Sequence, residues 1–154
     1  MMKKISFIFG AFLMLLLTGC DMNKPEITAE QFQTAMEAEG FTMDNSKDSN
    51  GKDDVIKRYL IAEKDGVAVN FLTFSNEAQA TRAYSLMQKK YEEEKSASNL
   101  TSSNKVSMGN YNKYSLRYND NYALMSQIGS TLIYVGTQAD KREWIASVVE
   151  KLGY

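Results

Sequence analysis

The side chains that could carry out chemistry are limited by a single cysteine, Cys20, and by the complete absence of histidine. One cysteine excludes a disulfide bond within the chain and leaves its thiol for modification. Histidine is the commonest metal ligand and the side chain best suited to proton transfer near neutral pH. We therefore expect neither a metal site nor a cofactor.

Two serines precede a lysine by three residues, which is the spacing of a serine nucleophile and its lysine partner. The pairs are Ser49 with Lys52 and Ser102 with Lys105. In that chemistry the serine begins a helix and the lysine follows one turn later. Both pairs lie in polar stretches that predict loops, so we interpret the spacing as chance.

Part of a calcium-loop pattern is present, with Ser46, Asp48 and Asn50 at the first three alternate ligand positions and Gly51 at the turn. The last ligand position of such a loop is a bidentate glutamate, and here it is Lys57. Because a cation at this position opposes the metal, we interpret the stretch as a solvated loop.

Carboxylates could pair for glycoside cleavage, one as general acid and the other as base or nucleophile. A general acid needs burial against apolar surface so that its pKa rises. The candidates stand in stretches that predict exposure to water: Asp44, Asp48, Asp53, Asp54, Glu92, Glu93 and Glu94. A cell-wall-directed hydrolase or transferase is therefore the alternative function, and we assign no catalytic residue.

Tyrosine is abundant, and five of the nine tyrosines lie on the second set of predicted strands, after residue 110: Tyr111, Tyr114, Tyr118, Tyr122 and Tyr134. Tyrosine is frequent in recognition surfaces, because its ring gives contact area at low entropic cost and its hydroxyl bonds polar ligands. It is also a favoured strand residue, so packing within a sheet is the other interpretation. If a recognition surface exists, we expect Tyr111 and Tyr122 in it, because Tyr114 and Tyr118 are needed inside.

The first 19 residues predict an export signal. Lys3 and Lys4 precede an apolar run from Ile5 to Leu17. As a helix this run would span only ~20 Å, well short of the roughly 30 Å core of a bilayer. A positive start, a short apolar middle and a small-residue end are typical of a cleaved signal peptide, and a permanent transmembrane anchor is the weaker interpretation.

The residues Leu17, Thr18, Gly19 and Cys20 resemble the lipobox of bacterial lipoproteins: an aliphatic residue, a small or hydroxyl residue, Gly or Ala, then cysteine. The resemblance implies a diacylglyceryl group on the Cys20 thiol and cleavage just before it. Two acyl chains hold a protein firmly at a membrane, whereas one chain binds only marginally. We expect a lipid-anchored protein that faces outside the cytoplasm. The other interpretation is an ordinary signal peptide that ends near a cysteine.

The mature chain is expected to form one domain. Removal of residues 1–19 leaves 135 of the 154 residues, with 20–27 as the lipidated cysteine and a tether that spaces the domain, and 28–154 as the domain. Loss of Lys3 and Lys4 with the leader changes the formal charge from −1 to −3. That sign argues against nucleic acid as a partner, because phosphate binding needs a basic patch.

Periodicity and turn residues predict the elements of this domain. Thr28 with Gln31 predicts a capping box for a helix that stops at Gly40, and Asp65-Gly66 is a hairpin turn signal. The stretch 96–104 predicts a loop. The other predicted elements are strands at 41–45, 55–63, 67–74, 111–119, 122–128 and 131–136, helices that begin after Ser75 or Asn76 and after Thr137, and turns at Asp120-Asn121 and Gly129-Ser130. This order predicts an α+β two-layer sandwich, an antiparallel sheet of six to seven strands with helices packed on one face.

The two halves of the domain are candidates for a duplicated αβββ unit, followed by a C-terminal helix. A shift of 55 residues lays Tyr59 on Tyr114 and the Asp65-Gly66 turn on Asp120-Asn121. Identity is slight, and any two units of a helix and a hairpin look alike, so both interpretations stay open.

From Thr28 to Tyr154 the chain resembles a group of small uncharacterised lipoproteins of Gram-positive bacteria. The resemblance lies in four segments: Thr28-Ala29-Glu30-Gln31-Phe32, Tyr111-Asn112-Lys113-Tyr114-Ser115-Leu116, Leu132-Ile133-Tyr134-Val135 and Leu152-Gly153-Tyr154. It implies attachment through Cys20 to the outer leaflet of the plasma membrane, and it transfers no functional residue. Our hypothesis from the sequence is a non-catalytic binding or interaction module whose partner, besides the membrane, is an unknown protein or envelope ligand.

Overall fold

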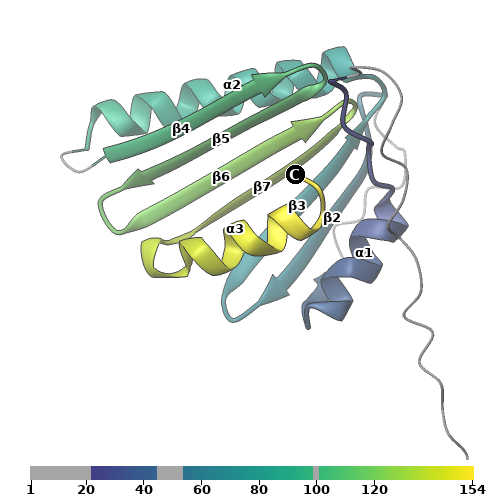
Figure 1. Cartoon of the computed structure of the whole chain (residues 1–154), viewed down its shortest axis with the longest axis horizontal. Helices are drawn as coiled ribbons and strands as arrows, with labels where there is room; N and C mark the ends of the chain where they lie inside the picture. The colour runs from purple at the N-terminus through teal and green to yellow at the C-terminus, as the bar shows by residue number, and fades with distance from the viewer. Residues whose placement is uncertain (1–21, 45–53, 99–100) are drawn as a thin grey trace, which may run out of the picture.

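The computed structural model describes residues 22–44, 54–98 and 101–154, which form a seven-stranded antiparallel sheet with three α-helices (Figure 1). The helices are α1 Ala29–Ala38, α2 Glu77–Ser96 and α3 Arg142–Lys151, the last preceded by a short 3-10 helix, Ala139–Lys141. The strands are β1 Thr42–Asp44, β2 Ile56–Lys64, β3 Val67–Phe74, β4 Thr101–Met108, β5 Tyr111–Tyr118, β6 Asn121–Ile128 and β7 Thr131–Gln138. Their order across the sheet is β1-β2-β3-β7-β6-β5-β4. The predicted α+β class and antiparallel sheet are confirmed.

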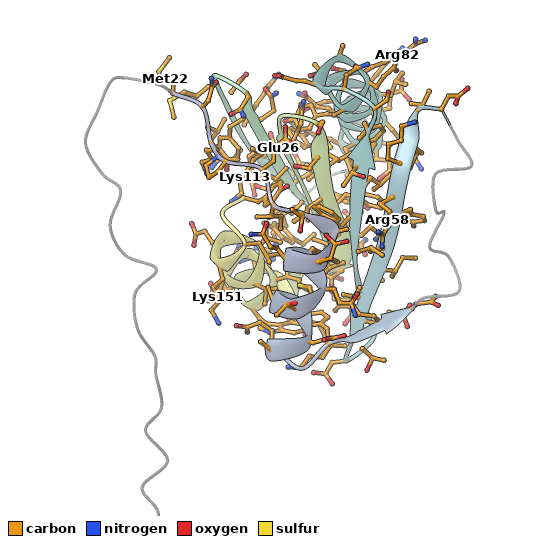
Figure 2. The ribbon with its side chains drawn as sticks, turned by 90° about the vertical axis from the view of Figure 1, so that its right-hand side faces the viewer. Met22, Glu26, Arg58, Arg82, Lys113 and Lys151 are labelled. Atoms are coloured by element: carbon orange, nitrogen blue, oxygen red, sulfur yellow. The ribbon has the colours of Figure 1, made fainter. Side chains whose placement is uncertain are left out.

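The helices cover both faces of the sheet, so the prediction that they share one face of a two-layer sandwich is wrong in that respect. Helices α1 and α3 pack on one face and α2 packs on the other (Figures 1 and 2). Along β7, Ile133 and Val135 join the core of α1 and α3, whereas Leu132 and Tyr134 join the core of α2. The reason is that the central strands are apolar on both sides, and each side has to be covered. We call these sides the α1/α3 face and the α2 face.

Helix α1 begins as predicted, at a capping box. The Thr28 hydroxyl accepts from the Gln31 backbone N–H at 3.2 Å, and the Gln31 side chain accepts from the Thr28 N–H at 2.8 Å. Gly40, with a φ of 80°, ends the helix in the left-handed conformation. On its buried side Phe32 stacks on Phe71 of β3, with ring centroids 4.7 Å apart. This aromatic pair fixes α1 on the α1/α3 face.

The hairpin turns are set by residues that tolerate positive φ. Asp65 and Gly66, at 50° and 75°, form the predicted turn between β2 and β3. The turn between β5 and β6 is Asn119-Asp120, one residue earlier than predicted, and Asn121 already belongs to β6. Asn119 takes the positive φ of 50°, a conformation that asparagine adopts more readily than most residues.

Strand β4 begins within the stretch 96–104 that the sequence predicts to be a loop, and it includes residues 101–104 of that stretch. Thr101 to Met108 pair with β5 over the full length of both strands, yet every side chain of β4 is exposed. The strand forms at the edge of the sheet through backbone pairing, without an apolar face. Periodicity in a sequence reveals strands whose side chains are buried on one face. An edge strand with polar, exposed side chains has no such periodicity and is therefore not predicted.

The arrangement of the strands agrees with two αβββ units. Strands β1-β2-β3 and β4-β5-β6 flank β7 from its two sides, and α1 and α2 lie on opposite faces. The 55-residue shift is nevertheless wrong. In β2 the side chain beneath α1 is Leu60, and in β5 the side chain beneath α2 is Tyr114. The shift pairs Tyr114 with Tyr59, which points to the face away from α1.

Residues 22–28 lie along the end of the sheet and do not form a free tether. Lys24 bonds to Asn110 in the β4–β5 turn, and Glu26 bonds to Ser130 in the β6–β7 turn. The predicted boundary at residue 28 thus falls inside the packed part of the chain. The described residues contain no helix that is both long enough and apolar enough to span a membrane.

Candidate functional site

Tyr111, one of the two tyrosines predicted for a recognition surface, is buried, and for this residue the prediction is wrong. Only 6% of its surface is exposed, and Lys24 Nζ lies 3.7 Å from its ring centroid. Tyr111 pairs with Ile128 of β6 on the α1/α3 face, where both belong to the core. Tyr122 is half-buried and packs on the same core, and it borders the hollow described next.

Tyrosines of the α2 face form the most distinctive candidate site. Tyr91 of α2 and Tyr118 of β5 are half-buried side chains that line a hollow of about 400 Å³. The hollow lies at the end of the sheet where β5 stops and β6 starts. We call it the tyrosine hollow; its other lining residues include Asn121, Ala123, Gly136 and Gln138.

The hollow exists because two small residues are paired beneath it. Ala123 of β6 stands opposite Gly136 of β7, and the next pair on the same face is Asn121 with Gln138. A β-carbon built on Gly136 would meet no atom within 4 Å. Ala123 and Gly136 therefore form the floor of the hollow and are too small to fill it. The side-chain amides of Asn121 and Gln138 lie at its outer end.

The phenols of the hollow are protonated at physiological pH, and burial raises their pKa further. The pKa of Tyr91 is raised by burial and then by Tyr118 and Glu94, and the pKa of Tyr118 is raised by burial and then by Glu94. A phenol with a raised pKa stays neutral at physiological pH and can donate a hydrogen bond. At the rim, Lys141 directs its ammonium to the backbone oxygen of Asp65 at 2.6 Å. The surface that the hollow offers is aromatic, amide-bearing and mostly uncharged.

A hydrogen-bonded cluster next to the hollow fixes two further tyrosines. The Tyr59 hydroxyl donates to Asn70 Oδ1 at 2.8 Å and lies 3.2 Å from the Tyr134 hydroxyl. Asn70, which is buried, donates to the Tyr134 backbone oxygen at 3.4 Å. Burial, together with the Tyr59 hydroxyl, raises the pKa of Tyr134. These polar groups satisfy one another, so we interpret the cluster as support for the α2 face.

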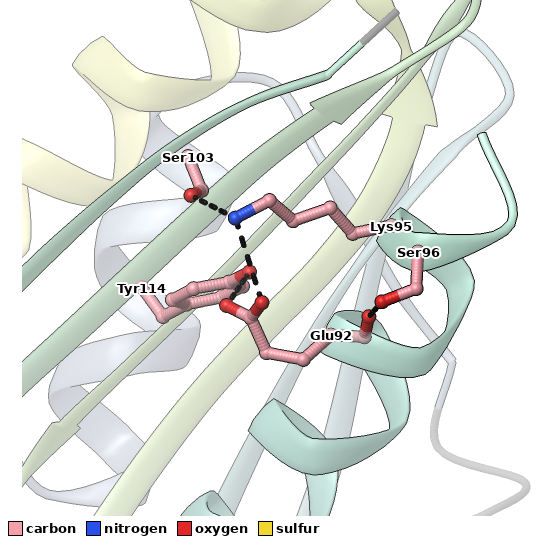
Figure 3. Close-up of polar contacts among 5 residues, drawn as sticks. All are labelled: Glu92, Lys95, Ser96, Ser103 and Tyr114. Atoms are coloured by element: carbon pink, nitrogen blue, oxygen red, sulfur yellow. Dashed lines mark hydrogen bonds and ion pairs between the residues drawn. The ribbon is translucent and has the colours of Figure 1, made fainter. Parts of the chain in front are cut away.

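A second polar cluster fastens α2 to the edge strands (Figure 3). Tyr114 donates to Glu92 Oε1 at 2.5 Å, Lys95 Nζ lies 3.5 Å from Glu92 Oε2, and the same ammonium donates to Ser103 at 3.0 Å. The Tyr114 hydrogen bond is the main cause of the lowered pKa of Glu92, with Lys95 adding to it. We call this cluster the α2 clamp, because it joins α2 to β4 and β5.

Tyr114→Phe is expected to lower the free energy of unfolding by about 1–2 kcal/mol. A hydrogen bond to a charged group contributes about 1.5–3 kcal/mol, and the partial exposure of Glu92 reduces that figure. Because the folded pKa of Glu92 lies below its usual 4.5, the contribution is complete above pH 4.5 and disappears as the pH falls through the folded value. Urea unfolding at neutral and acidic pH measures both effects.

The matched control for this variant is Glu93→Gln on the exposed side of α2, which should leave the urea midpoint almost unchanged. An equal loss of stability for Tyr114→Phe at neutral and at strongly acidic pH would contradict the proposed role of the Glu92 charge.

The carboxylates that the structure describes do not form the buried pair that glycoside cleavage needs. A larger hollow of about 630 Å³ is lined by charged residues, among them Arg117, Asp120, Asp140, Arg142 and Glu143, and its three acidic residues are exposed to water. In the described ranges no Asp or Glu is buried, and no group of three or more potential ligands could hold a metal ion. Of the carboxylates singled out from the sequence, Asp48 and Asp53 fall outside those ranges.

Of the other motifs noted in the sequence, the described residues include only the Ser102–Lys105 pair. Ser102 and Lys105 lie on β4, where they pair with Arg117 and Tyr114 and therefore point to opposite faces of the sheet. Ser49, Lys52 and the calcium-like positions from Ser46 to Gly51 fall outside the described residues, as do Leu17, Thr18, Gly19 and Cys20.

Comparisons with known proteins give no relative for this chain. It matches no protein-family model, no curated protein and no solved structure. The resemblance to bacterial lipoproteins therefore stays a prediction from the sequence, and the candidate site rests on geometry.

Proposed function

We propose that this protein is a lipid-anchored, extracytoplasmic binding module without catalytic activity, and that the tyrosine hollow is its ligand site. The anchor is supported by the Leu17-Thr18-Gly19-Cys20 motif behind a positively charged apolar leader. The binding role is supported chiefly by the hollow, whose walls are Tyr91 and Tyr118 and whose floor lacks side chains large enough to fill it.

The chemistry of the hollow favours an uncharged ligand that carries hydroxyl or amide groups. Aromatic faces give apolar contact, and the neutral phenols and the amides of Asn121 and Gln138 can exchange hydrogen bonds with such groups. Its volume of about 400 Å³ lies in the usual range of small-ligand sites, about 300–1,000 Å³. For a protein outside the cytoplasm, a glycan of the cell envelope has this chemistry.

For the rival function, a cell-wall hydrolase or transferase that uses carboxylates, residues 22–44, 54–98 and 101–154 offer no comparable arrangement. A general acid has to keep its proton near neutral pH, which requires burial. Asp120, Asp140 and Glu143, the acidic residues of the charged hollow of about 630 Å³, are all exposed. We therefore place recognition ahead of catalysis.

Gly136→Val is expected to weaken binding of an N-acetylglucosamine oligosaccharide at least about tenfold, a loss of about 1.4 kcal/mol, because the new side chain fills the floor of the hollow. The fold should persist, since a β-branched residue suits a strand and the space is empty. Titration calorimetry of the full-length protein in detergent measures the affinity, and thermal unfolding checks the fold.

Ser102→Val is the matched control, because it adds a β-branched residue at an exposed strand position on the other face of the sheet. It should bind the oligosaccharide like the unaltered protein. The proposal fails if neither protein binds the probe, if Gly136→Val binds as tightly as the unaltered protein, or if the oligosaccharide is cleaved.

A further inference from the structure

The segment that leads into α1 is locked to one end of the sheet. The Lys24 backbone N–H donates to Asn110 Oδ1 at 2.8 Å, and Asn110 Nδ2 donates back to the Lys24 oxygen at 2.9 Å. Asn23 Oδ1 accepts from the Asn110 backbone N–H at 3.2 Å. Asn110 thus holds two successive residues of the segment through three hydrogen bonds.

A second lock lies a few residues further along the chain. Both oxygens of the Glu26 carboxylate accept from Ser130, one from its backbone N–H at 2.8 Å and one from its hydroxyl at 2.7 Å. Lys24 Nζ donates to the oxygen of Gly153 at 3.0 Å while it lies over the ring of Tyr111. The segment is therefore tied to two hairpin turns and to the C-terminal end of the chain.

Two glycines make this close approach possible. A β-carbon at Gly109 would collide with the backbone oxygen of Met22, and a β-carbon at Gly129 would collide with the Glu26 carboxylate. Both glycines also have positive φ, at 56° and 53°. The turns are thus shaped to receive the segment, which a freely moving tether would not require.

Cys20, the proposed site of lipid attachment, is joined through Asp21 to Met22, which lies at the same end of the sheet (Figure 2). Cys20 precedes Met22 by two residues, so its α-carbon lies within about 7 Å of that of Met22 even in a fully extended chain. Figure 2 looks onto this end, where Met22 and Glu26 are labelled. Acyl chains on Cys20 would leave the protein beside the β4–β5 and β6–β7 turns.

Exposed apolar side chains gather at this end as well. Met22 is 60% exposed and Met108, the last residue of β4, is 46% exposed. Val106, two residues earlier on β4, and Val55, just before β2, are each 38% exposed. Apolar groups that are costly to leave in water gain free energy at the boundary between headgroups and acyl chains.

We propose that this end of the sheet is a membrane-docking surface: Met22, Met108 and the turns at Gly109-Asn110 and Gly129-Ser130 rest on the lipid surface of the bilayer. The inference rests on the proposed lipid anchor at Cys20. The tyrosine hollow lies at the opposite end of the same strands, because β6 runs from Asn121 at the hollow to Ile128 at the docking surface. Eight residues of strand span about 26 Å, so the hollow faces away from the membrane.

Depth-dependent quenching tests this orientation. Full-length lipidated protein carrying Met108→Cys or Asp120→Cys is labelled with a thiol-reactive fluorophore and bound to phosphatidylcholine–phosphatidylglycerol vesicles with brominated acyl chains. The introduced thiol is the single reactive one, because the chain has only one cysteine and the lipid occupies it. We expect severalfold stronger quenching at position 108 than at position 120. Equal quenching of both labels on bound protein overturns the docking surface and leaves the anchor standing.

Release of the segment provides the second test. Glu26→Ala combined with Asn110→Ala removes side-chain hydrogen bonds to both turns, so the difference in quenching between the two labels should collapse while vesicle binding persists. Asn104→Ala, on the exposed strand β4, is the matched control and should keep the difference. A difference that survives the double substitution contradicts the role of the locked segment. Protein that fails to bind vesicles at all overturns the anchor, and with it the docking.

Discussion

Cys20→Ala protein is expected to incorporate no fatty acid, and the portion of it that loses its leader should partition into the aqueous phase. The thiol is the attachment point that the lipobox implies, and the sequence contains no second cysteine to replace it. Without acyl chains, a mature chain of formal charge −3 lacks the lipid anchor, and its net charge does not favour attraction to an anionic membrane surface.

Metabolic labelling with a radioactive fatty acid, followed by detergent phase separation, measures this effect. Thr18→Ser is the matched control, because it keeps a small hydroxyl residue at its position in the motif and should incorporate the label normally. Label that persists in the Cys20→Ala protein would contradict thioether attachment at this residue.

Phe71→Ala is expected to lower the free energy of unfolding by about 3–5 kcal/mol, the usual cost of truncating a fully buried phenylalanine. Phe71 is 0% exposed and stacks on Phe32, so the truncation leaves a cavity between β3 and α1. Because small domains are stable by only about 5–15 kcal/mol, the variant should lose a large share of its stability.

Urea unfolding gives the measurement, with Leu86→Ala as the matched control. Leu86 lies on α2 and is 62% exposed, so its truncation should cost less than about 0.5 kcal/mol. A change below about 1 kcal/mol for Phe71→Ala would show that the stacked pair does not hold α1 to the sheet.

Local signals in the sequence predicted much of the fold. The Thr28–Gln31 capping box and the Asp65-Gly66 turn were placed correctly, because each depends on a few residues that satisfy their own backbone geometry. Strand β4 was not predicted, because no local side-chain pattern marks it. Its residues are held by backbone pairing at a sheet edge, and their side chains leave no periodic trace of burial.

The distribution of helices over two faces depends on side chains that one-dimensional periodicity does not resolve. The run Leu132 to Val135 is apolar without alternation, which is typical of a strand buried on both sides. Its pattern predicted a strand but did not indicate which helices would cover its two sides. The side-chain packing in the structure shows that α2 covers the second face of the sheet.

The sequence predicted that tyrosines would form the candidate site, but it did not identify which tyrosines. The excess of tyrosine pointed to a recognition surface, but Tyr111 proved to be in the core, and the hollow is lined instead by Tyr91 and Tyr118. The residue that could have indicated the position of the hollow is Gly136, because a glycine within a strand often marks a place where another group can approach the sheet closely. Its pairing with Ala123 depends on the register between β6 and β7, which the sequence alone does not fix.

The mass of the native protein purified from membranes shows whether Cys20 carries the lipid anchor. We expect a chain that begins at Cys20, lacks residues 1–19 and carries the added mass of a diacylglyceryl group on its N-terminal residue. A chain that still begins at Met1, or one with a free thiol at position 20, would contradict the lipid anchor and the membrane-docked arrangement built on it.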